Sequence, residues 1–151
     1  MNFSQITTHL FIGPMPTADD YRLLYDCGVR LVLNMRFSRR LPAGMVQPPI
    51  EVLWLPSFDN PLLPIPLAHL MRGTRAALQV IQSGGSIYAH CAHGRHRSVA
   101  MGAAILIAQG YTPEEAMQLI KQKRPQADPE VFYIKQRILS FARRWQQEVS
   151  K

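Results

Sequence analysis

Hydrophobic residues along the chain follow two patterns, short apolar runs and longer amphipathic stretches. The short runs end at turn-forming residues and are rich in β-branched residues and leucine, which predicts strands at 6–12, 29–35, 52–55 and 86–90. The longer stretches predict helices at 18–25, 67–82, 98–109, from 113 onwards and 128–147. Strands that alternate with helices, followed by a helical C-terminal part, predict an α/β fold: a small, mainly parallel central sheet flanked by helices, in a single domain of residues 1–151.

Polar residues at the predicted helix ends support these boundaries. Thr17 is expected to cap the helix that follows it, and the Thr-Pro-Glu-Glu sequence that begins at Thr112 is a capping box. Asp128 is interpreted in the same way, as the cap of the last helix. Seven of the twelve prolines lie between positions 42 and 66, so this region is expected to contain stiff loops.

The composition is that of a globular protein in a reducing compartment. With 151 residues, 47% of them hydrophobic, the chain can form a core without disulfides or structural metal ions. Its two cysteines, Cys27 and Cys91, make neither a disulfide framework nor a zinc-binding pair, so a cytoplasmic location without metal is expected. The N-terminal residues do not resemble a signal peptide, and the longest apolar run, 99–108, has half of the roughly 20 residues that a membrane span needs.

Charge adds a preference for an anionic partner. Seventeen lysines and arginines against ten carboxylates give a formal net charge of +7. Between Glu51 and Glu114 the only carboxylate is Asp59, although this stretch holds several arginines and histidines. A lone acid in a basic region is therefore a candidate for a chemical role.

The segment from Cys91 to Ser98 joins a predicted strand to a predicted helix. Its backbone N–H groups and the positive end of the helix are expected to form a concave site for a tetrahedral anion. Gly94 allows the tight turn, and the planar guanidinium of Arg97 can bind two phosphoryl oxygens. The same positive potential should stabilise the Cys91 thiolate, and Ser98 can donate a hydrogen bond to it.

The sequence His-Cys-x-x-Gly-x-x-Arg-Ser at 90–98 resembles the signature of the protein tyrosine phosphatase superfamily, and its details resemble the small atypical dual-specificity branch. Weaker matches at 10–13, 27–34, 110–116 and 123–125 extend the resemblance over nearly the whole chain. It implies a dual-specificity-phosphatase-like fold and an enzyme that hydrolyses phosphate monoesters on proteins, at phosphotyrosine and also at phosphoserine or phosphothreonine, through a phosphocysteine intermediate and without cofactor.

The resemblance also implies the roles of the residues. Cys91 is the nucleophile, Arg97 binds the phosphoryl group, Ser98 assists the thiolate and His90 supports the loop. Asp59, which lies 91 − 59 = 32 residues before the cysteine, is the general acid. The resemblance implies phosphate binding by the remaining loop residues, which are Ala92, His93, Gly94, Arg95 and His96. A bell-shaped pH profile with a mildly acidic optimum is expected.

Substrate choice remains open between two readings. Phosphorylated proteins are the main expectation, and the basic residue Arg95 resembles the loop of lipid-directed relatives, which makes phosphoinositides or other small phosphate esters the alternative. Arg36, Arg39 and Arg40 are expected either to line the substrate rim or to solvate a loop. Lys121, Lys123 and Arg124 are interpreted as a solvated helix face.

Several other functions fit the sequence less well. A sulfurtransferase needs no partnered aspartate, and a low-molecular-weight phosphatase carries its cysteine near the N-terminus. A non-catalytic phosphate-binding module would be expected to lack one of the three residues Cys91, Arg97 and Asp59. Nucleic-acid binding lacks interleaved aromatic residues and is not expected. The protein is expected to be a monomer, with Cys27 either an inert core thiol or a reversible disulfide partner of Cys91.

Overall fold

The computed structural model of the chain describes residues 1–38 and 49–151. Over these residues it has the following strands: β1 (Ser4–Thr7), β2 (Leu10–Gly13), β3 (Val29–Arg36), β4 (Glu51–Ser57) and β5 (Ser86–His90). Its helices are α1 (Ala18–Asp26), α2 (Leu67–Gln82), α3 (Arg97–Ala108), α4 (Pro113–Lys123) and α5 (Phe132–Val149). The α/β class predicted from the alternating pattern is confirmed.

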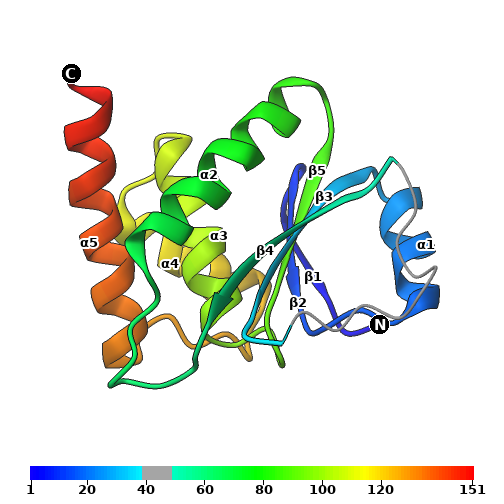
Figure 1. Cartoon of the computed structure of the whole chain (residues 1–151), viewed down its shortest axis with the longest axis horizontal. Coiled ribbons are helices and arrows are strands. Elements are labelled where there is room, and N and C mark those ends of the chain that lie inside the picture. Colours follow the sequence, from blue (N-terminus) through cyan, green and yellow to red (C-terminus); the bar gives the residue numbers. More distant parts are fainter. Residues whose placement is uncertain (39–48) are drawn as a thin grey trace.

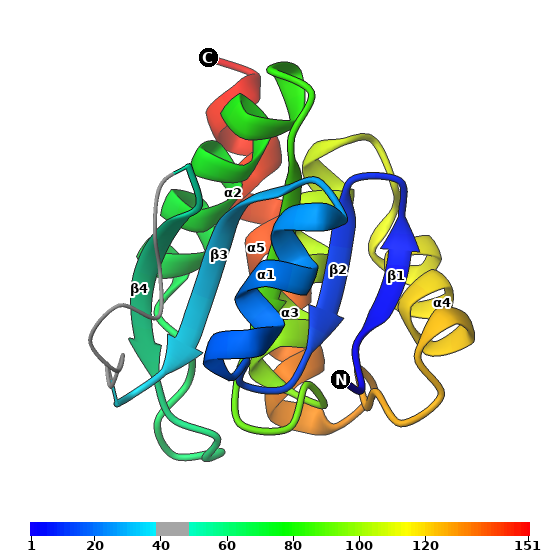
Figure 2. The ribbon, with the colours of Figure 1, turned by 90° about the vertical axis from the view of Figure 1, so that its right-hand side faces the viewer.

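The strands form one sheet in the order β1-β2-β5-β3-β4. β2, β5, β3 and β4 run parallel, and only β1 is antiparallel to its neighbour. The register places Gly13 and Asn34 on either side of His90, so the carboxyl ends of β2, β3 and β5 lie side by side. Figure 2 shows the arrows of β2 and β3 pointing towards this same end of the sheet. Loops that leave this end are therefore brought close to one another.

Helices cover both faces of the sheet unequally. α1 lies on one face, and α2, α3, α4 and α5 lie on the other (Figure 1). Alternation along β3 follows this division: Leu31 and Leu33 belong to the large core under α2 to α5, whereas Val32 packs with Leu24 of α1 in a smaller core.

Glycines allow α3 to pack closely against its neighbours. A Cβ atom at Gly102 would lie 2.5 Å from Ile12 Cδ1 of β2, and one at Gly73 of α2 would lie 2.7 Å from Met101 Sδ of α3. Residues Val99–Leu106 of α3 are buried. This packing fixes the N-terminus of α3, and with it the end of the loop from Cys91 to His96, relative to the sheet.

The predicted helix caps are confirmed at two places and wrong at a third. Thr17 and Thr112 each accept a hydrogen bond from the backbone three residues later, at 3.4 and 3.1 Å, in complete capping boxes. The last helix begins at Phe132 with Val131 as its N-cap, so Asp128 does not cap it.

The prediction of a single strand at 6–12 is wrong. The chain turns at Thr8 and His9, so β1 and β2 form an antiparallel hairpin, whose register shifts between Gln5 and Thr7. Among the helices of the described residues, none combines the length and the apolar character that crossing a bilayer requires.

Candidate active site

Cys91 follows the last residue of β5, at the carboxyl end of this central strand. Its side chain is buried, and its Sγ lies 3.3 Å from the Ser98 Oγ. Burial raises the pKa of the thiol, but the Ser98 hydroxyl and N–H, the Arg97 charge and the Gly94 N–H outweigh burial and bring the pKa below its usual value. The site therefore favours the thiolate form of Cys91.

The loop from Cys91 to His96, which we call the catalytic loop after its candidate role, leads directly into α3. No side chain of the described residues caps this helix, whose N-cap is His96, so its first N–H groups are available to an anion. Gly94 has φ +68°, and a Cβ there would lie 2.6 Å from the Gly13 carbonyl carbon and 2.8 Å from Arg124 Nη2. Both the backbone conformation and the space thus require glycine at position 94.

Donors outside the loop hold three successive loop carbonyls. Arg124 Nη2 donates to His93 O at 3.1 Å, and Arg124 Nε donates to Gly94 O at 2.8 Å. The Asp128 N–H donates to Arg95 O at 2.9 Å. Because these carbonyls are held by groups outside the loop, the peptide units of the loop are fixed in orientation.

Arg124 is therefore not part of a solvated helix face, as the sequence analysis predicted. It is 1% exposed and follows α4, with further hydrogen bonds from Nη1 to Asn2 O at 3.0 Å and to Ser4 Oγ at 3.1 Å. Only Lys121 and Lys123 are exposed as expected, and the Lys121 ammonium donates to Pro125 O and Ala127 O at 2.6 and 2.9 Å. The prediction failed because helical periodicity cannot show that a charged residue at a helix end lies against a distant loop.

Arg97 is buried at the start of α3 and is anchored to two strands. Its Nη1 donates to Ser57 O of β4 at 2.7 Å and to Met35 O of β3 at 3.3 Å. Its Nε is buried without a partner among the described residues. The two carbonyl contacts fix the plane of the guanidinium. Nη1, one of the donors expected to bind phosphate, is therefore used to orient the side chain.

Asp59 lies in the loop between β4 and α2 and reaches the catalytic loop through His96. Its Oδ2 accepts from His96 Nδ1 at 2.9 Å, and its Oδ1 accepts from Tyr133 Oη of α5 at 2.5 Å. Burial raises the pKa of Asp59, but these two hydrogen bonds and the charges of His96 and Arg97 dominate, so the pKa lies below its usual value. Asp59, predicted from its isolation in the sequence, is thus placed beside Cys91's loop.

His90 is buried at the end of β5, and its Nδ1 lies 3.4 Å from Cys91 O. Burial lowers its pKa to about 4, with a smaller opposite effect of that carbonyl, so the imidazole is neutral at physiological pH. The side chain of His90 is therefore suited to support the loop rather than to carry charge. Of the other loop residues, His93 and Arg95 are exposed and Ala92 is half-buried.

Two exposed aromatic residues follow β3 and β4, next to Arg36 and Asp59 in the chain. Phe37 and Phe58 stack with ring centroids 4.5 Å apart, and both side chains are exposed. Arg36 contacts Met15 Sδ through Nη1. Arg39 and Arg40, the other two predicted rim residues, lie outside the described residues.

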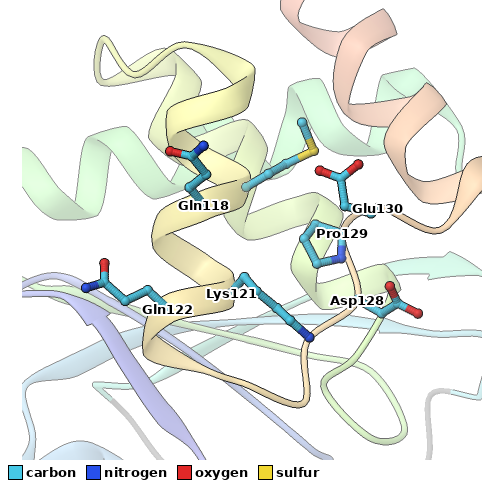
Figure 3. A pocket seen from close by; sticks show the side chains of 7 residues that line it. Gln118, Lys121, Gln122, Asp128, Pro129 and Glu130 are labelled. Atoms are coloured by element: carbon cyan, nitrogen blue, oxygen red, sulfur yellow. The ribbon is translucent and has the colours of Figure 1, made fainter.

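A pocket of about 430 Å³ lies next to the loop, between α4 and the segment that leads into α5 (Figure 3). It is lined by Met117, Gln118, Lys121, Gln122, Asp128, Pro129 and Glu130. Asp128 connects it to the site, because its Oδ2 lies 3.7 Å from His96 Nε2. Over the described residues, no three His, Cys, Asp or Glu side chains gather as a metal site would require.

Cys27 is exposed and does not lie near Cys91, so both predictions for it are wrong. Gly28 O accepts from Ser86 N at the start of β5, whereas Cys91 follows the other end of that strand. Five residues of extended strand separate these ends by roughly 16 Å. A disulfide needs Cα atoms within about 7 Å, so these two cysteines cannot pair without rearrangement of the sheet.

Comparisons with known proteins agree with this geometry. Residues 10–143 match the family model described as "Dual specificity phosphatase, catalytic domain". The chain is 34% identical over 128 residues to mouse dual specificity phosphatase 28, covering 84% of this chain and 76% of the relative. It is 33% identical over 130 residues to rat phosphatidylglycerophosphatase and protein-tyrosine phosphatase 1, covering 81% of this chain and 67% of that relative.

Solved structures give the same result for the fold. The crystal structure of human DUSP28 superposes with a TM-score of 0.84 at 27% identity, covering 96% of this chain and 99% of that chain. The crystal structure of PTPMT1 in complex with PI(5)P superposes with a TM-score of 0.83 at 27% identity, covering 97% and 98%. The mainly parallel sheet with helices on both faces is thus the fold of these phosphatases.

Proposed function

Because the chain belongs to the dual specificity phosphatase family and is a cysteine-based phosphatase, we propose that Cys91, Arg97, Asp59 and Ser98 carry its reaction. The observation that supports this assignment most strongly is the environment of Cys91. Its sulfur lies at the N-terminus of a buried helix, 3.3 Å from the Ser98 hydroxyl, in surroundings that lower the thiol pKa. Such a thiolate is a competent nucleophile at neutral pH.

In the first step, the thiolate sulfur attacks phosphorus and the bond to the leaving oxygen breaks. Arg97 and the loop N–H groups stabilise the charge on the phosphoryl oxygens. Asp59 gives its proton to the departing alkoxide or phenoxide, so the product leaves as a neutral alcohol or phenol. The phosphoryl group remains on Cys91 as a phosphocysteine.

In the second step, water attacks the phosphocysteine. The water oxygen bonds to phosphorus, the S–P bond breaks, and the Asp59 carboxylate takes the proton that water loses. Inorganic phosphate is released and both residues regain their initial protonation states. Ser98 stabilises the departing thiolate through the same hydrogen bond that lowers the Cys91 pKa.

The proposed substrates are phosphotyrosine and, in addition, phosphoserine or phosphothreonine on proteins. Phosphoinositides and other phospholipids are the second candidate, because Phe37 and Phe58, the neighbour of Asp59 in the chain, form an exposed apolar pair and the side chain of Arg95 is exposed beside the anion site. One relative is named for both activities, phosphatidylglycerophosphatase and protein-tyrosine phosphatase.

A substrate panel with two variants tests these roles. Phosphotyrosine and phosphothreonine peptides, a phosphoinositide and a phosphatidylglycerophosphate are assayed with the parent, Cys91→Ser and Asp59→Asn. We expect no turnover with Cys91→Ser, and with Asp59→Asn a loss on the order of 10²–10⁴ that is largest for poor leaving groups. Turnover of every substrate by Cys91→Ser would refute the assignment.

We also propose that the protein works as a monomeric single domain of residues 1–151 in the cytoplasm, on phosphate esters and without metal, cofactor or nucleic-acid partner. The location is proposed because the Cys91 thiolate must stay unoxidised to act, and a reducing compartment keeps thiols in that state. Light scattering of the purified protein tests the oligomeric state, and dialysis against a chelator tests the independence from metal. A dimer, or activity lost on chelation and restored by a metal, would refute the respective part.

A further inference from the structure

Both carboxyl oxygens of Asp59 are occupied by side chains from elements far apart in the sequence. His96 Nδ1, at the end of the catalytic loop, donates to Oδ2 at 2.9 Å. Tyr133 Oη, in the first turn of α5, donates to Oδ1 at 2.5 Å. Arg97 also holds Ser57 O, two residues before Asp59, at 2.7 Å, but the carboxyl group itself is held by His96 and Tyr133.

His96 is itself held in place. Its Nε2 lies 3.7 Å from Asp128 Oδ2, and its ring lies 5.9 Å from the Tyr133 ring at 61°. The imidazole thus lies between two carboxylates and beside an aromatic ring, with 19% of its side chain exposed. His96 is also the residue that precedes Arg97, so its side chain ties Asp59 directly to the phosphate-binding backbone.

We propose that His96 and Tyr133 are positioning residues that hold the carboxyl group of Asp59 at the mouth of the catalytic loop. The inference rests on the proposed function, in which Asp59 protonates the leaving oxygen. A general acid must lie within hydrogen-bond reach of that oxygen, and two donors from different directions fix the carboxyl plane more firmly than one. We call this arrangement the Asp59 clamp.

The clamp has a consequence for acidity. The groups that face Asp59 are His96 of the loop, Arg97 of α3 and Tyr133 of α5, and Asp128 faces His96 from the other side. Both donors stabilise the carboxylate more than the carboxylic acid, so the clamp orients Asp59 while lowering the fraction that is protonated. Loss of a donor therefore worsens the position of the acid and raises its pKa at the same time.

Three variants test the clamp. His96→Ala and Tyr133→Phe each remove one donor, and Tyr111→Phe removes the hydroxyl of a tyrosine in the turn before α4 as the matched control. For each, kcat/KM is measured against pH with 4-nitrophenyl phosphate, which has a good leaving group, and phenyl phosphate, which has a poorer one. The maximum for each substrate and the midpoint of the alkaline limb are compared.

We expect each donor deletion to raise the ratio of kcat/KM between the good and the poor leaving group by about tenfold, the effect of one hydrogen bond to a charged group. The alkaline limb is expected to move to higher pH, because the Asp59 pKa rises. The conservative variant His96→Asn keeps an N–H donor near the position of Nδ1 and should restore most of the leaving-group ratio. Tyr111→Phe should keep the parental values.

A structural role alone predicts a different result, namely an equal loss with both substrates and an unmoved alkaline limb. Three results would overturn the proposal of the clamp: this pattern of a structural role, parental behaviour of both deletions, or failure of His96→Asn to restore the leaving-group ratio. Asp59→Asn separates this failure from failure of the proposed function. If Asp59→Asn abolishes the alkaline limb while the clamp variants leave it in place, only the clamp is wrong; if Asp59→Asn keeps the limb, the general-acid assignment is wrong.

Discussion

Replacement of Arg124 by methionine removes the guanidinium group that holds the back of the catalytic loop. In the parent, this group donates to Gly94 O, His93 O, Asn2 O and Ser4 Oγ at 2.8 to 3.1 Å. Methionine has a similar length and fills most of the buried volume, so the variant tests the hydrogen bonds with a small cavity effect. The question is whether the loop keeps its anion-binding shape without these donors.

The magnitude follows from the acceptors left behind. A buried carbonyl that loses its partner destabilises the folded state by about 1–3 kcal/mol, and two loop carbonyls lose theirs. Removing a buried positive charge offsets part of this loss, because burial disfavours the charged guanidinium and lowers the Arg124 pKa. We therefore expect the free energy of unfolding to fall by about 2–4 kcal/mol, which a domain of this size tolerates.

The effect on activity should exceed that of a general loss of stability. Loss of one aligned donor to a reacting anion lowers kcat by about 10²–10³, and loosening of the loop should lower kcat/KM by about 10–100-fold. Denaturant unfolding, kcat/KM and the inhibition constant of inorganic phosphate are measured together. Arg124→Lys, which keeps the charge without the planar fork, should fall between parent and Arg124→Met.

Lys123→Met is the matched control, because it removes one positive charge from the neighbouring, exposed position. It should change the free energy of unfolding by less than about 0.5 kcal/mol and leave kcat/KM at the parental value. If Arg124→Met binds inorganic phosphate and turns over substrate as the parent does, the loop does not depend on this residue. The argument from the fixed carbonyls would then be refuted.

Three further substitutions probe the loop and its supports. Gly94→Ala places a Cβ at a φ of +68° and within 2.6 Å of the Gly13 carbonyl carbon. We expect kcat/KM to fall by at least about 100-fold and the melting temperature to decrease, and a parental kcat/KM would contradict the close approach. Ser98→Ala removes a donor that lowers the Cys91 pKa, so the midpoint of iodoacetamide alkylation against pH should move to higher pH, and an unmoved midpoint would exclude this role. Thr112→Ala should lower the free energy of unfolding by about 1 kcal/mol in denaturant without affecting kcat/KM, because the cap it removes lies away from the site; a loss of kcat/KM would contradict this separation.

Local signals made most elements predictable. The strands at 29–35 and 86–90 and the helix at 67–82 follow from apolar periodicity, and Thr17 and Thr112 mark helix starts, because each signal depends on neighbours in the sequence. The hairpin inside 6–12 escaped prediction since Thr8 and His9 carry no glycine, asparagine or proline turn signal.

Within the candidate site, sequence analysis singled out residues whose signal is visible in the sequence itself. Cys91, Gly94 and Arg97 lie in one short motif, and Asp59 was found because no other carboxylate lies near it in the sequence. Arg124 and Tyr133 were missed, because each acts through an atom 30 or more positions away: Arg124 on Gly94 O, and Tyr133 on Asp59. Their roles arise from tertiary contacts that no local pattern encodes.

The two reacting groups, Cys91 and Asp59, must be in opposite protonation states, and their surroundings set the pH at which both states are populated. Activity requires the thiolate of Cys91, whose fraction rises above its pKa, and the protonated carboxyl of Asp59, whose fraction falls above its pKa. Both pKa values are lowered, although burial opposes ionisation at each group. At the Cys91 thiol, the effects of Ser98 and Arg97 outweigh burial. At the Asp59 carboxyl, burial is outweighed by His96, Tyr133 and Arg97. Both limbs of the kcat/KM profile are therefore displaced to lower pH, and the maximum should lie on the acidic side of neutrality. Steady-state assays with an aryl phosphate between about pH 4 and pH 9 check this expectation. Activity that rises steadily towards alkaline pH would mean that Asp59 does not act as the acid, because the protonated fraction of a carboxyl falls as the pH rises above its pKa, and the rate should fall with it.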